Sequence, residues 1–306
     1  MNNGTRLRRC WLGLAVLSIA FSPWLVAWAR FGWTDELASY VLLIPVISAY
    51  LIWQRRSEPM TGSSGSTRLA IVPAVLALIF AGIAFGISGH GAGAARHDYL
   101  TPAVIAFLLA GLAWAIFTLG VGPVAQHRFA IAFLLFAAPL PTWAVNGLEI
   151  FYQHTSAEVA AWLIQLCGIP MLRGGLYFRL PGITIQVAQE CSGIRSSLVL
   201  FIVSILGGYM LLAHPGKRLA LALFVIPLGI VRNAFRILTI AWLCVHFGAR
   251  MIDSPIHHRG GPIFFGLSLI PLFLFLLWLR RRERAKPAVN SRTASGEQSL
   301  AKASEL

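Results

Sequence analysis

A cysteine in a short polar stretch is the first candidate for chemistry. Cys191 lies in Glu190-Cys191-Ser192-Gly193, directly before an apolar run, and Arg195 follows about one helical turn later. Ser and Gly are common where helices begin, so we expect a helix to start here. The helix dipole and a nearby guanidinium both favour a thiolate, which makes Cys191 a candidate nucleophile. A small buried hydrophobe is the alternative role for a free cysteine, and this stretch alone leaves both open.

A second polar group interrupts a later apolar run at Arg232, Asn233 and Arg236. The two arginines are four residues apart, so both project from one face of a helix. Ionisable side chains at membrane depth are costly and are functional by default. Arginines near the end of a span can instead extend their charge to the interface at little cost. The nearby amide of Asn233 favours the functional interpretation.

Two histidines form the third group, because His257 and His258 precede Arg259-Gly260-Gly261 and the last apolar run. A histidine there could act as an acid or base, or donate a hydrogen bond to an oxyanion. A solvated loop histidine is the alternative. The three groups can act together only if the elements that carry them bring them to one place.

The composition indicates that a membrane protein carries these residues. Of the 306 residues, 57% are hydrophobic and 12% are charged, about half the charged share of an ordinary soluble domain. Apolar runs of about 18 or more residues can cross a hydrocarbon core as helices. The predicted fold class is therefore an all-α polytopic membrane protein. Its eight predicted spans are Trp11–Ala29, Tyr40–Gln54, Leu69–Ser88, Thr101–Val121, Phe129–Val145, Ser197–Leu212, Leu219–Ile237 and Pro262–Leu279.

The distribution of basic residues predicts that both chain ends lie on the cytoplasmic side. In that orientation 16 of the 25 Lys and Arg residues fall in inner segments, as the positive-inside rule expects. This asymmetry accounts for the net charge of +14 without a nucleic-acid partner, since no basic face carries stacking aromatic residues. The same orientation places the thiol, the arginines and the histidines at one outer face.

Three segments are not predicted spans. A Gly- and Ser-rich inner loop covers Arg56–Thr67, and a polar cytoplasmic tail, expected to be disordered, covers residues 285–306. The third is an outer segment of about 50 residues, 146–196, in which apolar and other residues alternate on either side of Pro181-Gly182. This period of two predicts a β-hairpin. Residues 1–284 are predicted to form a single integral membrane domain.

Neither a metal nor a cofactor is expected. The four cysteines lack the short paired spacing of a zinc site or a redox motif. The patterns HExxH, GxSxG and GxxxxGK[ST], which carry zinc, serine-nucleophile and nucleotide chemistry, are absent from the sequence.

The chain resembles the exosortase/archaeosortase family, polytopic membrane enzymes that process C-terminal sorting signals of exported proteins. The resemblance covers about residues 31–265, and its most specific part is the Cys-Ser-Gly-Ile-Arg stretch. Bacterial members often have Ser-His where this chain has Ser39-Tyr40, and Asp is common at the position of His258. The resemblance rests on GWTDELASYVLLIPVISAYLIWQRR (32–56), FLLFAAPLP (133–141), GIPMLRGGLYFRLPGITIQVAQECSGIRSS (168–197), the N-x-x-R of Asn233 and Arg236, and the H-x-x-x-G of His257 and Gly261.

The resemblance implies a triad in which Cys191 is the nucleophile and Arg236 and His257 assist it. Archaeal members look more like R-N-x-x, which would select Arg232 instead. Acyl transfer through a thioester is the implied reaction. The residues with supporting or alternative roles are Arg232, Asn233, Arg195, His258 and Glu190.

The resemblance also implies the partners and the location. The substrates would be exported proteins with a C-terminal motif, a transmembrane helix and a basic tail. The acceptor would be lipid- or polysaccharide-linked, and membrane lipids would surround the enzyme. The location would be the bacterial inner (cytoplasmic) membrane, with the site on the outer, periplasmic face.

A different class of protein remains open from the sequence. A non-enzymatic transporter or an assembly component for exported polysaccharide would use the arginines to bind an anionic lipid-linked substrate. That class predicts that Cys191 tolerates replacement while the arginines do not.

Overall fold

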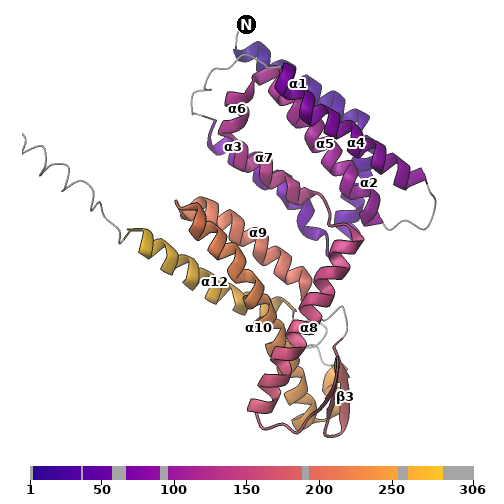
Figure 1. Cartoon of the computed structure of the whole chain (residues 1–306), viewed down its shortest axis with the longest axis vertical. Helices are drawn as coiled ribbons and strands as arrows, with labels where there is room; N and C mark the ends of the chain where they lie inside the picture. The colour runs from indigo at the N-terminus through magenta and orange to yellow at the C-terminus, as the bar shows by residue number, and fades with distance from the viewer. Residues whose placement is uncertain are drawn as a thin grey trace, which may run out of the picture. The chain divides into compact units, whose positions relative to one another are not determined.

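The computed structural model describes residues 3–35, 37–56, 67–89, 96–187, 193–253 and 261–284. The predicted tail 285–306 and nearly all of the predicted inner loop lie outside these residues. The chain forms two compact units, Met1–Gly147 and Leu148–Leu306. Both are built mainly from helices, and the second also holds a small sheet (Figure 1).

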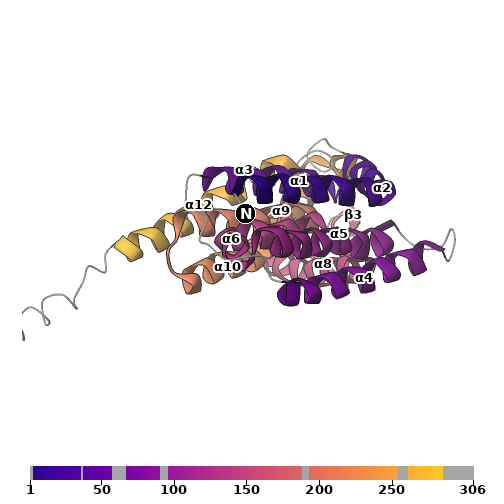
Figure 2. The ribbon, with the colours of Figure 1, turned by 90° about the horizontal axis from the view of Figure 1, so that it is seen from above.

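The first unit packs its helices around α5, which contacts both α4 and α1. Gly13 permits the approach of α1, because a Cβ at this position would overlap the indole of Trp114 on α5. Figure 2, seen from above, shows α1 and α5 running side by side. The elements of this unit are α1 (Asn3–Ala20), α2 (Ser22–Thr34), η1 (Ser39–Leu42), α3 (Leu43–Gln54), α4 (Thr67–Gly89), α5 (Arg96–Leu119), α6 (Val121–Gln126), α7 (Arg128–Phe133) and η2 (Leu134–Ala137).

The second unit begins within a long helix, α8, whose first residues belong to the preceding unit. Its helices α9, α10 and α12 pack against one another through a buried cluster that includes Leu200, Leu221 and Leu272. The elements are α8 (Thr142–Leu166), β1 (Leu172–Gly174), β2 (Tyr177–Leu180), β3 (Ile183–Gln186), α9 (Ile194–Leu211), α10 (Pro215–Phe247), η4 (Ala249–Asp253) and α12 (Gly261–Arg284).

The sheet confirms the predicted hairpin and adds a strand to it. β2 and β3 are antiparallel, with Phe178 opposite Ile185, and Gly182 takes the positive φ of 80° that their turn requires. β1, which the sequence did not predict, pairs with the other edge of β2. Phe178 is fully buried in a cluster with Ala157 of α8 and Ala234 of α10. The sheet is therefore fixed against these two helices.

Five helices are long and apolar enough to cross a membrane, namely α4, α9, α10, α12 and α5 from His97. Two bent pairs raise the number to seven if each pair is one span, and the apolar stretch Ser39–Gln54 is shorter. Each of the eight predicted spans overlaps one of these elements. The polytopic all-α fold is thereby confirmed, with five to seven candidate spans among the described residues.

The predicted span Phe129–Val145 is not one straight helix. Its first part is α7 with η2, and the chain then bends by 86° into α8. Pro139 and Pro141 lie at the break, where proline removes the amide donors that a continuous helix needs. The predicted span Trp11–Ala29 is likewise bent, by 76°, between α1 and α2, where Pro23 lies in the first turn of α2.

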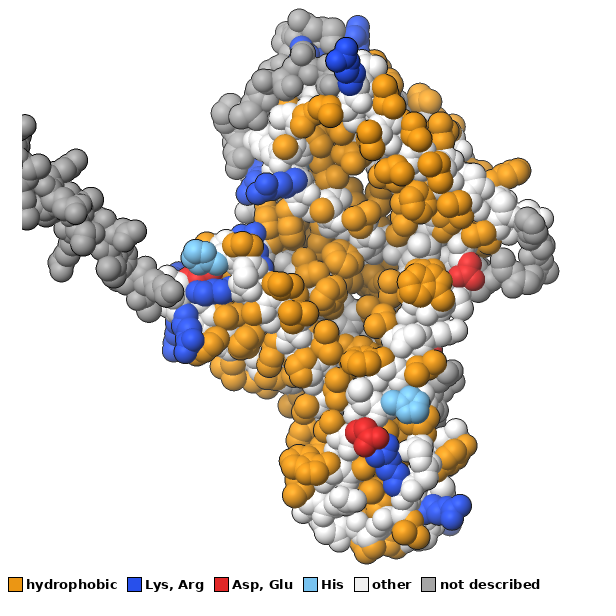
Figure 3. Space-filling model, in the orientation of Figure 1, with side chains coloured by type: hydrophobic (Ala, Val, Ile, Leu, Met, Phe, Trp, Pro, Cys, Tyr) orange, Lys and Arg blue, Asp and Glu red, His pale blue; other side chains and the backbone are white. Residues whose placement is uncertain are grey.

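The outer surfaces of the helices fit a membrane environment. In α4, Leu78 and Phe85 are each more than 70% exposed, and hydrophobic side chains cover much of the face seen in Figure 3. Such side chains would be costly to expose to water over so wide an area, whereas lipid tails accept them. The chain is a multi-pass membrane protein.

Candidate active site

The structure describes half of the predicted site residues. Cys191, Glu190, His257 and His258 lie outside the described residues. The other four are described: Arg195 lies on α9, and Arg232, Asn233 and Arg236 lie on α10.

Arg232 contacts the start of the helix that follows Cys191. Its Nη2 donates hydrogen bonds to the carbonyl oxygen of Gly193, at 2.7 Å, and to Oγ of Ser197, at 3.1 Å. The Ser197 hydroxyl itself donates to the same Gly193 carbonyl, at 3.0 Å. Arg232 is only 8% exposed, so its charge is held among these polar groups rather than in solvent. The first turn of α9 is thus tied to the middle of α10.

Gly193 is suited to this position for two reasons. Its φ of 73° lies in the left-handed region, which side chains other than glycine adopt at a cost. A Cβ would also lie 2.8 Å from Nη2 of Arg232 and 3.2 Å from Oδ1 of Asn233. The close approach of the arginine to this carbonyl therefore depends on the missing side chain.

A third helix, α8, also packs beside Ser197. Tyr152 of α8 is buried beside the Ser197 hydroxyl. Gly229 of α10 lies against both, because a Cβ there would be 2.6 Å from Oγ of Ser197 and 3.1 Å from Cε1 of Tyr152. The three helices α8, α9 and α10 meet here with no space for a larger residue at position 229.

The chain before Cys191 is also anchored. Gln153 of α8 is buried, and its Nε2 donates a 2.6 Å hydrogen bond to the carbonyl oxygen of Val187. The amide of Val187 donates in turn to the carbonyl oxygen of Leu176. Val187 and Gly193 are the described residues on either side of the segment 188–192, so each end of that segment is held by a side chain from a neighbouring helix.

Several buried polar atoms near these anchors have no partner among the described residues. They are Nη1 of Arg232, Nδ2 of Asn233 and Oγ of Ser156. Asn233 is 1% exposed, and Ser156 precedes Ala157, which packs with Ala234 in one cluster. A buried donor left unsatisfied costs about 1–3 kcal/mol, so polar groups are expected nearby to receive these hydrogen bonds.

The remaining two predicted residues are placed differently. Arg236 lies one turn beyond Arg232 on α10 and is partly exposed. Arg195 is exposed in the first turn of α9, whereas its neighbours Ile194 and Ser197 are buried. Arg232 and Asn233 are therefore the two predicted residues that the structure brings to Gly193.

Sequence reasoning missed Tyr152, Gln153 and Ser197. Ser197 is four residues after Gly193, a spacing that could have marked it as a helix-start hydroxyl. No sequence pattern identifies Gln153, because the sequence predicts an outer segment at residues 146–196 but not the elements that this segment packs against. Its role follows from the packing of α8 against β3 and α10.

The early acidic residue Asp35 has a local structural role. Its Oδ1 accepts hydrogen bonds from the amides of Leu37 and Ala38, at 2.8 and 3.1 Å. Its Oδ2 lies 3.7 Å from Nε2 of His97 on α5. These contacts join the turn after α2 to α5 within the first unit.

No group of three or more His, Cys, Asp or Glu residues that could hold a metal ion occurs in the described parts of the chain. The described site is instead made of the guanidinium of Arg232, the amides of Gln153 and Asn233, and the hydroxyls of Tyr152, Ser156 and Ser197. Such groups orient a backbone and donate hydrogen bonds to an oxyanion or to a carbonyl oxygen.

Fold and site define a multi-pass membrane protein in which three helices enclose a polar group next to a cysteine-bearing segment. The sequence matches the transmembrane exosortase family over residues 32–274. The match spans most of the chain, and the chain belongs to this family. No curated protein and no solved structure matches it.

Proposed function

We propose that the protein is a membrane-embedded cysteine peptidase or transpeptidase that cleaves the C-terminal sorting signal of exported proteins. The supporting observation is the contact between Arg232 and Gly193. Cys191 is two residues from Gly193, so covalent geometry keeps the two Cα atoms within about 7 Å of each other. A buried guanidinium therefore acts on the backbone immediately beside the proposed nucleophile.

The proposed reaction has two steps. The Cys191 thiolate attacks the scissile carbonyl carbon of the substrate, a carbon–sulfur bond forms, and the carbon–nitrogen bond breaks as the leaving amine takes a proton. A second nucleophile, water or an acceptor amine, then attacks the thioester and releases the thiolate. His257 supplies and accepts the protons of these steps.

The two arginines have different proposed roles. Arg232 already donates to the chain at Gly193 and Ser197 and is buried, which suits a positioning residue. Arg236 lies one turn further along α10 and is partly exposed. We assign Arg236 to the oxyanion or the leaving group, with Arg232 as the alternative. Asn233, Arg195, His258 and Glu190 keep supporting roles.

The length of α10 supports a site at a membrane surface. The helix has 33 residues and is about 50 Å long, whereas a hydrocarbon core is about 30 Å thick. Arg232 lies 17 residues after Pro215, a rise of about 26 Å. If α10 enters the membrane near Pro215, Arg232 is close to the opposite face, and the rest of the helix packs on the sheet.

The substrates, the acceptor and the orientation are part of the proposal. The substrates are exported proteins with a C-terminal motif, a transmembrane helix and a basic tail, and the acceptor is lipid- or polysaccharide-linked. The site faces outward from the bacterial inner membrane. A substrate anchored by its own helix would diffuse to the site within the bilayer.

Gene deletion and complementation test the proposal. Deletion should leave C-terminal signals uncleaved on exported proteins, and the wild-type gene should restore cleavage. Cys191→Ala should fail to restore it, while a variant that retains Cys191 but has Ser at Cys10, Cys167 and Cys244 should succeed. Normal cleavage by Cys191→Ala would refute the thiol mechanism. If export of polysaccharide then failed only in arginine variants, the non-enzymatic alternative would be favoured.

A further inference from the structure

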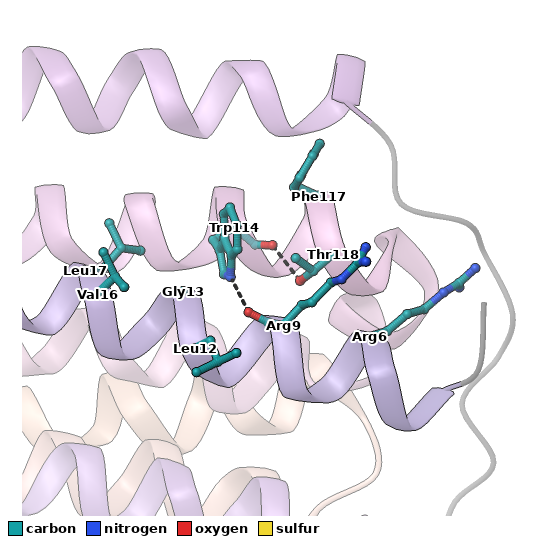
Figure 4. Close-up of a pocket in the computed structure, with 9 residues that line it drawn as sticks. All are labelled: Arg6, Arg9, Leu12, Gly13, Val16, Leu17, Trp114, Phe117 and Thr118. Carbon is teal, nitrogen blue, oxygen red and sulfur yellow. Dashed lines mark hydrogen bonds between the residues drawn. The ribbon is translucent and has the colours of Figure 1, made fainter.

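A pocket in the first unit is lined by none of the residues of the site described above. It is a cavity of about 720 Å³ between α1 and α5. Figure 4 shows its nine lining residues, with two arginine side chains at one end and Val16 and Leu17 at the other. Its two ends therefore differ in chemistry.

The larger part of the pocket is apolar and opens to the surroundings of the helices. Leu12 and Val16 of α1 line it and are both more than 60% exposed. Trp114 and Phe117 of α5 form the opposite wall. The indole is fixed by its packing on Gly13 and by hydrogen bonds of 3.2 Å from Nε1 to the carbonyl oxygens of Arg9 and Cys10. In a membrane these apolar side chains face hydrocarbon, so the acyl chain of a lipid is the group that fits against them.

The other end of the pocket is strongly basic. Arg6 and Arg9 are three residues apart, so they project from one face of the first turns of α1. The N-terminal end of a helix carries partial positive charge, which adds to that of the two guanidinium groups. An anion at this end would therefore be stabilised.

We propose that this pocket binds an anionic phospholipid. Its phosphate lies between Arg6 and Arg9, and one acyl chain follows the apolar wall towards Val16 and Leu17, a distance of about 12 Å along α1 from Arg9. Basic pockets between transmembrane helices are known to take anionic headgroups. A basic peptide would be repelled by the arginines, and a free phosphate would leave the apolar wall uncovered.

The matched control is on the same helix. Arg8 is exposed and carries the same charge, but it does not line the pocket. The purified chain in mild detergent is titrated with phosphatidylglycerol and, separately, with phosphatidylcholine of the same acyl chains. Bound lipid is counted by native mass spectrometry. Each arginine near an anionic headgroup contributes about fivefold in affinity, so Arg6→Gln/Arg9→Gln should weaken phosphatidylglycerol binding about 25-fold. Arg8→Gln should leave it within about twofold.

A second variant tests the apolar wall without changing the charge. Val16→Trp adds bulk at an exposed position of the pocket and should lower phosphatidylglycerol binding while both arginines remain. Equal binding of the two lipids by the wild type, or an equal loss with Arg8→Gln, would overturn the proposal. So would competition by glycerol 3-phosphate as strong as that by the lipid, which would indicate a phosphate site. The purified protein could also prove to be a dimer. If Val16→Trp dissociated that dimer without changing the amount of bound lipid, the result would show that a second copy of the chain occupies the pocket.

Discussion

The Nη2 atom of Arg232 lies 2.7 Å from the carbonyl oxygen of Gly193 and joins the middle of one long helix to the first turn of another. The carbonyl accepts from the Ser197 hydroxyl as well. Because Arg232 is buried, loss of this contact would leave its charge with few other groups to accept its hydrogen bonds. The spacing in the sequence places both arginines on one helix face, and the structure shows that Arg232 is the one that donates to Gly193.

We expect Arg236→Lys to abolish processing and Arg232→Lys to reduce it less. An ammonium cannot reproduce the forked donors of a guanidinium, and loss of a donor to an oxyanion costs about 10²–10³ in rate. A lysine at position 232 could keep one hydrogen bond to the first turn of α9. The measurement is the fraction of precursor in cells that express each variant at equal level. A dead Arg232→Lys together with a normal Arg236→Lys would reverse the assignment.

Gln153→Leu should reduce both stability and processing. The substitution keeps a similar volume but removes the donor to the Val187 carbonyl, and an unsatisfied buried acceptor costs about 1–3 kcal/mol. The matched control is Gln165→Leu, at an exposed position of the same helix. Thermal unfolding in detergent and precursor accumulation are the two measurements. Equal behaviour of both variants would show that the Gln153 hydrogen bond is dispensable.

Gly229→Ala should destabilise the three-helix contact by about 1–3 kcal/mol, the usual range for overpacking. The added methyl group would lie 2.6 Å from Oγ of Ser197. Gly207→Ala is the control, because its Cβ would meet only Leu276, at an ordinary 3.8 Å. Adding Ser197→Ala to Gly229→Ala should cost less than the sum of the two single changes. Strict additivity would show that the clash is not at Ser197.

The proposed orientation can be tested with cysteine labelling. Cys167 is exposed beyond the end of α8, whereas Cys10 and Cys244 are buried. In intact cells that carry Cys191→Ala, a membrane-impermeant maleimide should label Cys167, and Cys167→Ser should remove the signal. A cysteine at Arg284, introduced as Arg284→Cys in this Cys167→Ser background, should react only after the membrane is permeabilised. Labelling of that cysteine in intact cells would place the C-terminal end of α12 outside.

The sequence determined the class of the protein and the local elements that depend on residue pattern. Long apolar runs identify spans without reference to their neighbours, because lipid imposes the same requirement on each of them. The alternation around Pro181-Gly182 likewise determines the β2–β3 hairpin, since a period of two places Phe178 and Leu180 on one face. The motifs around Arg232 and Asn233 identified candidate residues, and the structure brings these two to Gly193.

Only the tertiary structure decided which of these residues meet. Arg232 and Arg236 share a helix face, and the packing of α9 against α10 determines that Arg232 reaches Gly193. Gln153 and β1 gave no sequence signal, because a long-range hydrogen bond or strand pair depends on a partner far along the chain. The break between η2 and α8 has local causes in Pro139 and Pro141, whereas its angle of 86° follows only from the structure. Sequence pattern thus sets what each segment can form, and contacts between distant segments set where its side chains lie.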